Sequence, residues 1–316
     1  MLNRAIMQAK TIAIGGHIRP DGDCVGSCMG LYQYIKNNFN EIDVDVYLED
    51  IPECFKEMLP ITAEIKNTID ELKTYDLFIA LDCGDMTRLG FSSVLYEQAK
   101  ATFCVDHHVS NQAFADENYI IPEASSTAEL VYRLLDKEKI DIGIAECLYM
   151  GIVHDTGVFQ YSSTSPETME IAADLMRKDI RANEIIDKTY YEKTYAQNQI
   201  LGRALLESFL CMNGKCIVSY ITKKVMDLHG VTSKDLEGIV SQLRVTKGVE
   251  VAIFLYEIGE KEFKISLRAS GDVDVSKVAV TFGGGGHKKA AGFTMKGTVH
   301  EILNDLLLLF SHAANI

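Results

Sequence analysis

Short apolar runs along the first half of the chain predict the strands of a sheet. Thr11–Ile14, Leu77–Leu81 and Ala101–Val105 are brief and largely apolar, which is typical of parallel strands buried on both faces. Residues 42–48 alternate between apolar and polar side chains and predict a further strand. The spacing of these runs leaves room for a helix after each strand, which indicates a doubly wound α/β sheet.

The segments between the strands carry the apolar periodicity of helices. Residues 24–36 fit a helical stripe, and Asp23 is predicted to be the N-cap of this helix. Residues 142–153 form a mostly apolar helical run, and Pro166 after Ser165 predicts the first turn of another helix.

The second half of the chain predicts a smaller domain. Residues 183–209 show a helical pattern without proline, and the middle of this pattern, Tyr190–Gln199, is predicted to connect two domains. Later segments predict two helices, a strand and a hairpin around Gly259: helices 235–244 and 299–310, strand 216–221, and hairpin strands 249–257 and 262–268. We therefore expect an N-terminal domain of residues 1–187 with a mainly parallel sheet, a helical linker of residues 188–208, and a C-terminal α/β domain of residues 209–316.

Composition places the chain among water-soluble globular proteins. Its 316 residues are 47% hydrophobic and 24% charged, which suits about two domains with ample cores. No signal peptide or apolar run of about 18 residues is visible, so a cytoplasmic protein without a membrane partner is expected. The eight cysteines form no C-x-x-C pair, which disfavours a zinc ribbon and favours a reducing compartment. The net charge of −14 disfavours binding to long nucleic acid.

Acidic and imidazole side chains follow three predicted strands and one predicted helix. A lone histidine beside a carboxylate is commonly just a hydrogen-bonded pair, but repetition of the pattern favours a shared site. Ligands bind beyond the carboxyl ends of the strands in a doubly wound sheet, so these side chains are expected to meet there. The segments are His17-x-x-x-Asp21-x-Asp23, Asp82-Cys-Gly-Asp85, Asp106-His107-His108 and His154-Asp155-Thr-Gly.

The residue types at these positions predict a site for two divalent cations. Imidazole and carboxylate ligands without thiolate suit Mn²⁺, Mg²⁺, Co²⁺ or Fe²⁺. Four crowded carboxylates repel one another unless cations neutralise them, and two metal ions would also assist in-line attack on phosphorus. Asp82 stands alone after the central strand and is the expected bridging ligand. The predicted ligands are His17, Asp21, Asp23, Asp82, His107 and Asp155.

Together, the four motifs resemble the DHH phosphoesterase superfamily, and the segment G-G-G-G-H-K-K-A-A-G at residues 283–292 resembles its DHH-associated C-terminal domain. The compact two-domain form is most similar to the bacterial nano-RNase and pAp phosphatase group, where pAp is 3′-phosphoadenosine 5′-phosphate. The resemblance implies two metal ions, commonly Mn²⁺. His17 and Asp21 would bind one, the trio Asp23, His107 and Asp155 the other, and Asp82 both.

The resemblance also implies roles for residues outside the ligand set. His108 would stabilise charge on the substrate phosphate or act as an acid. Asp106 would orient a neighbouring histidine, although a ligand role stays open. In the second domain, Arg268 and His287 would hold the other phosphate of the substrate or its base. The glycines of the run, Gly284, Gly285 and Gly286 among them, would let backbone N–H groups approach an anion.

Two further contacts with phosphate are predicted from the first domain. Ser126 and Glu129 match a capping box, and the free N–H groups at this helix start are expected to hold a phosphate. A role for Ser126 as a helix cap alone is the alternative. Arg88 is either a phosphate contact or a member of a surface ion pair.

The expected activity is hydrolysis of very short oligonucleotides to mononucleotides and removal of the 3′-phosphate of pAp. A cyclic-dinucleotide phosphodiesterase would share both domains and is the nearest alternative. A manganese pyrophosphatase, a single-strand exonuclease and a non-catalytic nucleotide-binding regulator are further alternatives. Short oligonucleotides and nucleoside bisphosphates are thus the expected partners, and a homodimer is left open.

Overall fold

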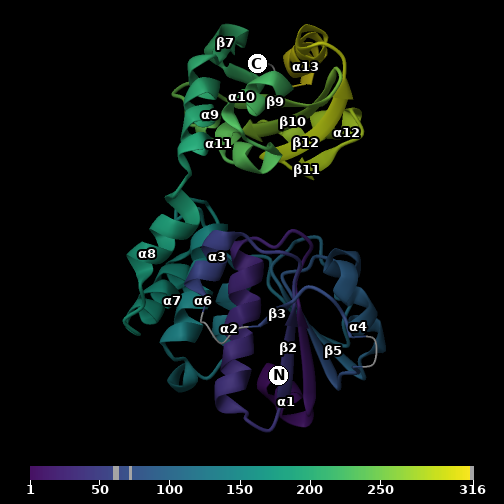
Figure 1. Cartoon of the computed structure of the whole chain (residues 1–316), viewed down its shortest axis with the longest axis vertical. Coiled ribbons are helices and arrows are strands. Elements are labelled where there is room, and N and C mark those ends of the chain that lie inside the picture. Colours follow the sequence, from purple (N-terminus) through teal and green to yellow (C-terminus); the bar gives the residue numbers. More distant parts are fainter. Residues whose placement is uncertain (60–63, 71–72, 314–316) are drawn as a thin grey trace. The chain divides into compact units, whose positions relative to one another are not determined.

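The chain forms two compact units, each built on its own sheet. The computed structural model describes residues 1–59, 64–70 and 73–313, and the units divide between Glu192 and Lys193 (Figure 1). This point lies inside the segment 188–208 that was predicted as a linker. Both units are α/β structures, which confirms the predicted fold class.

The sheet of the first unit is parallel and reverses its order in the middle. Its strand order is β3-β2-β1-β4-β5-β6, and every pairing among the described strands is parallel. The chain builds outward from β1 in one direction and from β4 in the other, so the switch point lies between these two strands. The strands are β1 Thr11–Gly15, β2 Asp43–Tyr47, β3 Ile65–Lys66, β4 Leu77–Leu81, β5 Ala101–Asp106 and β6 Glu117–Ile120.

Both faces of this sheet are buried, which explains the continuous apolar runs in its strands. Ile12 and Ile14 belong to one hydrophobic cluster, whereas Ala13 between them belongs to another. Side chains alternate across a strand, so the two clusters lie on opposite faces. The helices are α1 Leu2–Gln8, α2 Gly22–Asn38, α3 Glu53–Met58, α4 Ser93–Gln98, α5 Thr127–Leu134, α6 Ile142–Asp155, α7 Pro166–Met176 and α8 Ala182–Ile186, with 3₁₀ turns at Met86–Ser92 and Lys137–Lys139.

Two helices that deliver site residues, α2 and α6, pack against each other at small side chains. A Cβ atom on Gly26 of α2 would lie 2.4 Å from the carbonyl oxygen of Cys147 in α6. The cap of α2 differs from the prediction. Asp21, not Asp23, is the N-cap, and its Oδ1 accepts hydrogen bonds from the backbone N–H groups of Asp23 and Cys24, each at 3.1 Å.

The predicted long helix over residues 183–209 is wrong, because the chain breaks it. After α8 comes a π-helical turn, Asp187–Tyr191, and then three residues without helical structure. A new helix, α9, spans Tyr195–Leu206 and begins with a capping box of Thr194 and Gln197. Helix α9 buries Ile200 and Ala204 in the core of the second unit.

The second unit contains a mixed sheet with helices on both faces. The strand order is β11-β12-β10-β9-β8-β7; β8 and β9 are parallel and the other described pairs antiparallel. The predicted hairpin is confirmed, but the predicted helix 235–244 is interrupted at Gly238, whose φ is 84°. The elements are β7 Phe209–Cys211, β8 Cys216–Ile221, α10 Lys223–His229, α11 Ile239–Arg244, β9 Val251–Gly259, β10 Glu262–Ala269, α12 Val275–Thr281, β11 Gly285–His287, β12 Ala290–Lys296 and α13 Val299–Ala313, with 3₁₀ turns at Met212–Gly214 and Ser233–Leu236.

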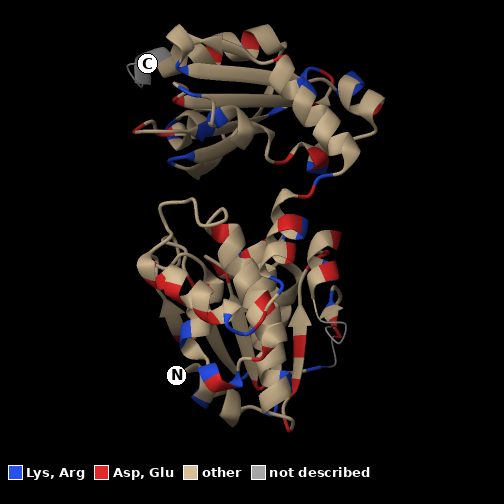
Figure 2. Ribbon diagram, turned by 90° about the vertical axis from the view of Figure 1, so that its left-hand side faces the viewer, with Lys and Arg blue, Asp and Glu red and all other residues tan. Residues whose placement is uncertain are grey.

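The structure shows where the charged, apolar and cysteine residues of the chain lie. Asp and Glu are spread over many elements of the first unit and are not gathered in a single segment (Figure 2). Within the described residues, no helix combines the length and the apolar character needed to cross a bilayer. All eight cysteines are free thiols.

Candidate active site

The predicted ligands converge at the carboxyl edge of the first sheet. His17 follows β1 and Asp82 follows β4, so they lie on the two sides of the switch point. His107 follows β5, and Asp155 ends α6. Asp21 and Asp23 belong to the start of α2. We call this set the acid–imidazole cluster: His17, Asp21, Asp23, Asp82, His107 and Asp155.

Asp82 lies at the centre of the cluster and divides its two oxygens between two imidazoles. Its Oδ2 is 3.4 Å from Nε2 of His17, and its Oδ1 is 3.6 Å from Nε2 of His107. Thr127 donates a hydrogen bond from Oγ1 to the same Oδ1 at 3.0 Å. The backbone of Asp82 has a φ of 58°, a left-handed conformation that costs energy in a residue other than glycine. Such strain at a strand end is typical of a functional position.

His17 presents Nε2 to the carboxylates because its other nitrogen is occupied. Nδ1 donates to the backbone carbonyl of Ile18 at 2.9 Å, which fixes the tautomer of the neutral ring. Nε2 lies 3.5 Å from Oδ2 of Asp21. Burial would lower the pKa of His17, but the contacts with Asp21 and Asp82 outweigh burial and raise it to about 12.

His107 has the same arrangement on the other side of Asp82. Its Nδ1 lies 3.4 Å from the carbonyl oxygen of Ala124, and its Nε2 lies 3.0 Å from Oδ2 of Asp155 and 4.0 Å from Oδ2 of Asp23. Burial lowers the pKa of His107, but the surrounding carboxylates, Asp155 foremost, raise it to about 10. Both imidazoles therefore direct Nε2 into a strongly negative environment.

Asp23 occupies the N-terminus of α5, where the sequence predicted a bound phosphate. The backbone N–H groups of Thr127 and Ala128 donate to its two carboxylate oxygens at 2.6 and 2.8 Å. These N–H groups are therefore not free, contrary to the expectation, and the contact of this helix start with a phosphate stays a prediction. Burial, with the charges of Asp82 and Asp155, raises the pKa of Asp23 well above its usual value.

Ser126 serves as the N-cap of α5 and is fully buried. Its Oγ accepts the N–H of Glu129 at 3.1 Å. The reciprocal half of the predicted capping box is absent, since the Glu129 carboxylate accepts hydrogen bonds from Ser125 and Thr168 instead. This geometry favours the alternative of a structural cap over a contact with substrate.

His108 differs from the other two imidazoles in orientation. Its Nδ1 donates to Oδ1 of Asp106 at 2.7 Å, whereas Oδ1 of Asp82 lies 3.7 Å from the same nitrogen. Asp106 is therefore the hydrogen-bond partner of this nitrogen, and Asp82 is not. Asn111 donates to the other oxygen of Asp106 at 2.7 Å and to the carbonyl of Cys83 at 2.9 Å. The hydrogen bond that His108 donates to Asp106 raises the pKa of His108. Burial would raise the pKa of Asp106, but its bond with His108 lowers it.

The donor set of the cluster fits divalent cations. Asp23 is fully buried and Asp82 is 2% exposed, so solvent does little to screen these charges. Four carboxylates exceed the charge that two protonated imidazoles balance, and the remainder must be neutralised in place. Three compact donor groups lie within the described residues: His17 with Cys24 and Asp82, Asp82 with His107 and His108, and Asp23 with His107 and Asp155.

His154 links the first and last motifs without joining the cluster. A Cβ atom on Gly22 would lie 2.1 Å from its ring, so only glycine fits between Asp21 and Asp23. Thr189 donates its hydroxyl to the carbonyl of Ile185 at 2.7 Å, and Nε2 of His154 lies 2.9 Å from that hydroxyl oxygen. Burial lowers the pKa of His154 to about 4, so the ring is neutral at physiological pH.

Of the residues expected to hold the rest of the substrate, Arg268 and His287 belong to the second unit and Arg88 to the first. Arg268 is near the end of β10, and its Nη1 donates to the carbonyl of Leu267 at 3.0 Å. His287 is an exposed residue of β11. Arg88 is exposed on the 3₁₀ turn after β4, and its carbonyl accepts the N–H of Ile18 at 2.8 Å.

The glycine run is partly explained by strand packing. A Cβ atom on Gly284 would lie 2.3 Å from the carbonyl oxygen of Gly292, and one on Gly286 would lie 2.4 Å from that of Ala290. Gly285 has open space around its Cα. The predicted contact of this run with an anion stays a prediction.

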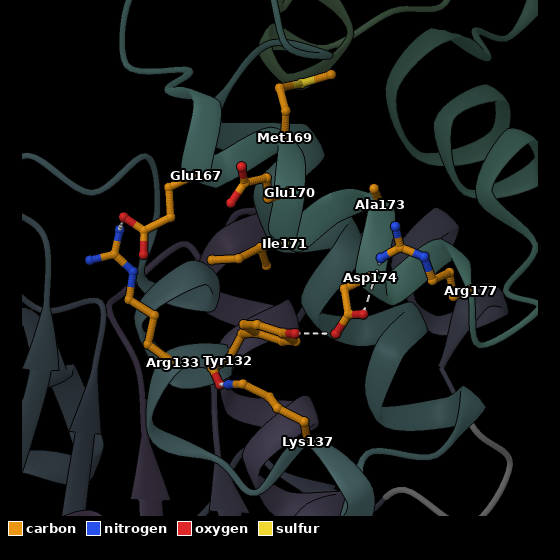
Figure 3. Close-up of a pocket in the computed structure, with 10 residues that line it drawn as sticks. All are labelled: Tyr132, Arg133, Lys137, Glu167, Met169, Glu170, Ile171, Ala173, Asp174 and Arg177. Atoms are coloured by element: carbon orange, nitrogen blue, oxygen red, sulfur yellow. Dashed lines mark hydrogen bonds and ion pairs between the residues drawn. The ribbon is translucent and has the colours of Figure 1, made fainter.

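A separate surface pocket lies between α5 and α7 and includes no predicted site residue (Figure 3). Four of its charged side chains are already paired with one another. Arg133 contacts Glu167 at 2.9 Å, Arg177 contacts Asp174 at 3.2 Å, and Tyr132 donates to Asp174. The pocket is therefore poorly suited to a highly charged ligand.

Family models match both units of the chain. Residues 11–152 match the N-terminal domain of the DHH family, and residues 213–313 match the DHHA1 domain. The parallel sheet and every member of the acid–imidazole cluster except Asp155 lie within residues 11–152. The chain thus combines a DHH-family N-terminal domain with a DHHA1 domain and is a hydrolase acting on phosphoester bonds, as the sequence predicted.

Relatives of known name extend over most of the chain. A protein of Thermus thermophilus named bifunctional oligoribonuclease and PAP phosphatase NrnA is 28% identical over 90% of this chain and 84% of its own length. The protein of the same name in Bacillus subtilis is 26% identical over 92% and 91%. The crystal structure of an exopolyphosphatase-related protein from Bacteroides fragilis has a TM-score of 0.90 and 28% identity, covering 98% of this chain and 95% of that one.

Sequence reasoning missed three residues that hold the site together. Thr127 binds Asp82, Asn111 binds Asp106, and His154 packs on Gly22. Thr127 and His154 lie inside motifs that the sequence had singled out, but their contacts depend on how distant segments meet. Asn111 carried no such signal, because a polar residue after a strand is commonly only part of a turn.

Proposed function

We propose that this protein hydrolyses very short oligonucleotides to mononucleotides and removes the 3′-phosphate of pAp, with two divalent cations, most favourably Mn²⁺. The names and nearly full-length coverage of its relatives support the substrate class. The observation that carries the metal assignment is Asp82, whose two oxygens face two imidazoles that each direct Nε2 inward.

Each member of the cluster has a proposed ligand role. His17 and Asp21 would hold one cation, the trio Asp23, His107 and Asp155 the other, and Asp82 both. Bound in this way, two divalent cations supply an activated water and stabilise negative charge on the phosphoryl oxygens. The carbonyl of Ile18 holds Nδ1 of His17, and the carbonyl of Ala124 holds Nδ1 of His107. Together with the hydrogen bond from Thr127 to Asp82, these contacts orient the ligand atoms toward the site.

His108 and Asp106 have a proposed role in proton transfer. Asp106 holds Nδ1 of His108, which leaves Nε2 for a hydrogen bond with the substrate. As water attacks phosphorus and the P–O bond to the sugar breaks, the protonated ring donates its Nε2 proton to the departing oxygen. The raised pKa of His108 keeps this proton available near neutral pH.

The second unit has a proposed role in binding the remainder of the substrate. Arg268 and His287, with the backbone of Gly284, Gly285 and Gly286, would hold a second phosphate or a base. A longer strand would bring additional phosphates against a chain with a net charge of −14, so about two to five nucleotides is the expected length. Arg88 is a further candidate contact with phosphate.

Comparison of substrates with bound Mn²⁺ tests the proposal. We expect cleavage of pAp and of the dinucleotide pApA, and values of kcat/KM that fall as the strand lengthens toward about 24 nucleotides. Arg268→Ala should raise KM for pApA more than for p-nitrophenyl phosphate, which has no second phosphate. Rates that rise steadily with length would favour an exonuclease, and cleavage of cyclic dinucleotides in preference to both linear substrates would favour the cyclic-dinucleotide alternative.

A further inference from the structure

An aromatic cluster adjoins the Asp155 side of the acid–imidazole cluster. The ring of Tyr161 packs directly on Gly157, since a Cβ atom there would lie 2.4 Å from Cζ of Tyr161. Gly157 also has a φ of 57°, a conformation that favours glycine. The N–H of Tyr161 donates to the carbonyl of Thr156 at 2.9 Å. The tyrosine ring is therefore fixed over the residues that follow Asp155.

A second ring, Tyr190, joins this tyrosine to the motif from the other side. Its centroid is 5.5 Å from that of His154, the residue before Asp155. Burial and a hydrogen bond with Tyr161 raise the pKa of the Tyr190 hydroxyl. Tyr191 packs edge-on against Tyr190 at a centroid distance of 5.2 Å. Tyr190 thus contacts both Tyr161 and Tyr191.

The outer two rings are exposed although their positions are fixed. Tyr161 is 49% exposed and Tyr191 is 52% exposed, whereas Tyr190 between them is partly buried. Tyr190 and Tyr191 belong to the π-helical turn that interrupts the chain after α8. Such turns are rare and occur frequently at functional sites. Exposed aromatic rings at fixed positions offer faces on which a planar ligand can stack.

We propose that Tyr161 and Tyr191 form a stacking platform for a base of the nucleotide substrate. The inference rests on the proposed function, because a phosphoester held at the acid–imidazole cluster brings its nucleoside into the same neighbourhood. Bases stack on aromatic side chains irrespective of their identity. The platform therefore favours a nucleotide over a phosphoester without a base, and it adds affinity in a protein whose net charge is −14.

Binding of a fluorescent, uncleavable dinucleotide tests the platform without turnover. One base of the probe is 2-aminopurine, and a CH₂ group replaces the oxygen of the scissile P–O bond. A counterpart of the probe lacks the 2-aminopurine base. Stacking on the wild-type protein should quench the fluorescence. Tyr161→Leu and Tyr191→Leu should each raise the dissociation constant of the probe about 5- to 150-fold, the value of one base stacked on an aromatic ring. The base-free counterpart has no fluorophore, so its dissociation constant is measured by isothermal titration and should rise much less.

Matched variants separate stacking from general effects. Tyr191→Phe retains the ring and should bind the probe as the wild type does. Tyr161→Phe retains the ring but loses its hydrogen bond with Tyr190, so its dissociation constant should rise less than that of Tyr161→Leu. Tyr220→Leu removes a tyrosine that is 39% exposed on β8 and should change neither constant. Thermal unfolding of every variant identifies any loss of fold.

Hydrolysis of unlabelled pApA is measured separately, so the two proposals fail in different ways. Unchanged binding and quenching in both leucine variants, or no quenching by the wild type, overturns the platform. Tyrosine-dependent quenching without any hydrolysis of pApA or pAp by the wild type overturns the proposed function and leaves the platform standing.

Discussion

Replacement of Asp82 by asparagine is the sharpest perturbation of the proposed metal site. The change keeps the size of the side chain, and an amide oxygen still accepts a hydrogen bond from Thr127. It removes one negative charge that lies 3.4 Å from Nε2 of His17 and 3.6 Å from Nε2 of His107. At an effective dielectric constant of about 20, a unit positive charge at either distance interacts with that carboxylate by about 5 kcal/mol.

A divalent cation carries twice that charge, so the expected loss is substantial even after solvent and relaxation reduce it. A loss of about 3 kcal/mol for each cation raises its dissociation constant about 150-fold. We therefore expect the purified Asp82→Asn variant to retain less than one Mn²⁺ ion per chain after dialysis against micromolar Mn²⁺. Turnover of pAp should fall by about three orders of magnitude or more.

Metal analysis of dialysed protein, combined with isothermal titration and a phosphate-release assay, measures both effects. Asp85→Asn is a matched control, since Asp85 is an exposed acid three residues away whose carboxylate caps the following 3₁₀ turn. That variant should retain the metal content and turnover of the wild type. Two bound Mn²⁺ ions and near-normal turnover in Asp82→Asn would refute the bridging role.

Three other changes give distinct expected results. His108→Ala should keep both cations but lower kcat about 10²- to 10³-fold, and metal analysis showing one ion lost would make His108 a ligand. Thr127→Val removes the hydroxyl bound to Asp82 and should weaken Mn²⁺ binding about 10- to 100-fold in titrations, whereas unchanged affinity would leave that hydrogen bond without influence on the metal. Asp45→Asn should lower the free energy of unfolding by about 1–3 kcal/mol at pH 7, because Asp45 is buried and accepts from Lys73. Burial would raise the pKa of Asp45, but the hydrogen bond with Lys73 lowers it. The stabilisation is therefore present above the ordinary pKa of an aspartate and is lost as the pH falls through the lowered pKa of the folded state. Denaturant titrations should show the difference in unfolding free energy between variant and wild type shrinking below about pH 4.

The convergence of the ligands was predictable because it follows from sheet geometry. Apolar runs ended at His17, Asp82 and His107, and parallel strands place their carboxyl ends at one edge. The difference between His107 and His108 was not predictable from the sequence. Nδ1 is the engaged nitrogen in both rings, so the difference depends on its partner, the carbonyl of Ala124 or the carboxylate of Asp106, and packing sets both partners.

Errors in the sequence analysis arose where two acceptors compete for one donor. Asp21 and Asp23 are both good N-cap residues, and only the position of α5 decides between them. The N–H groups of α5 suit a phosphate as well as they suit the carboxylate of Asp23.

The break in the predicted long helix had a different cause. No residue between Asn183 and Phe209 is a strong helix breaker apart from Gly202, which lies inside α9. Local propensity therefore did not reveal the break at residues 192–194.

The contact between Gly22 and His154 joins segments from opposite ends of the first unit. Such a contact forms only after the intervening chain has closed a long loop, and the entropy of that closure slows folding. Until α6 docks on α2, Asp155 is not held beside His107 and the ligand set has no fixed form. We expect a refolding chain to acquire its secondary structure before its affinity for metal, so the time course of Mn²⁺ uptake would report the closing of the whole unit.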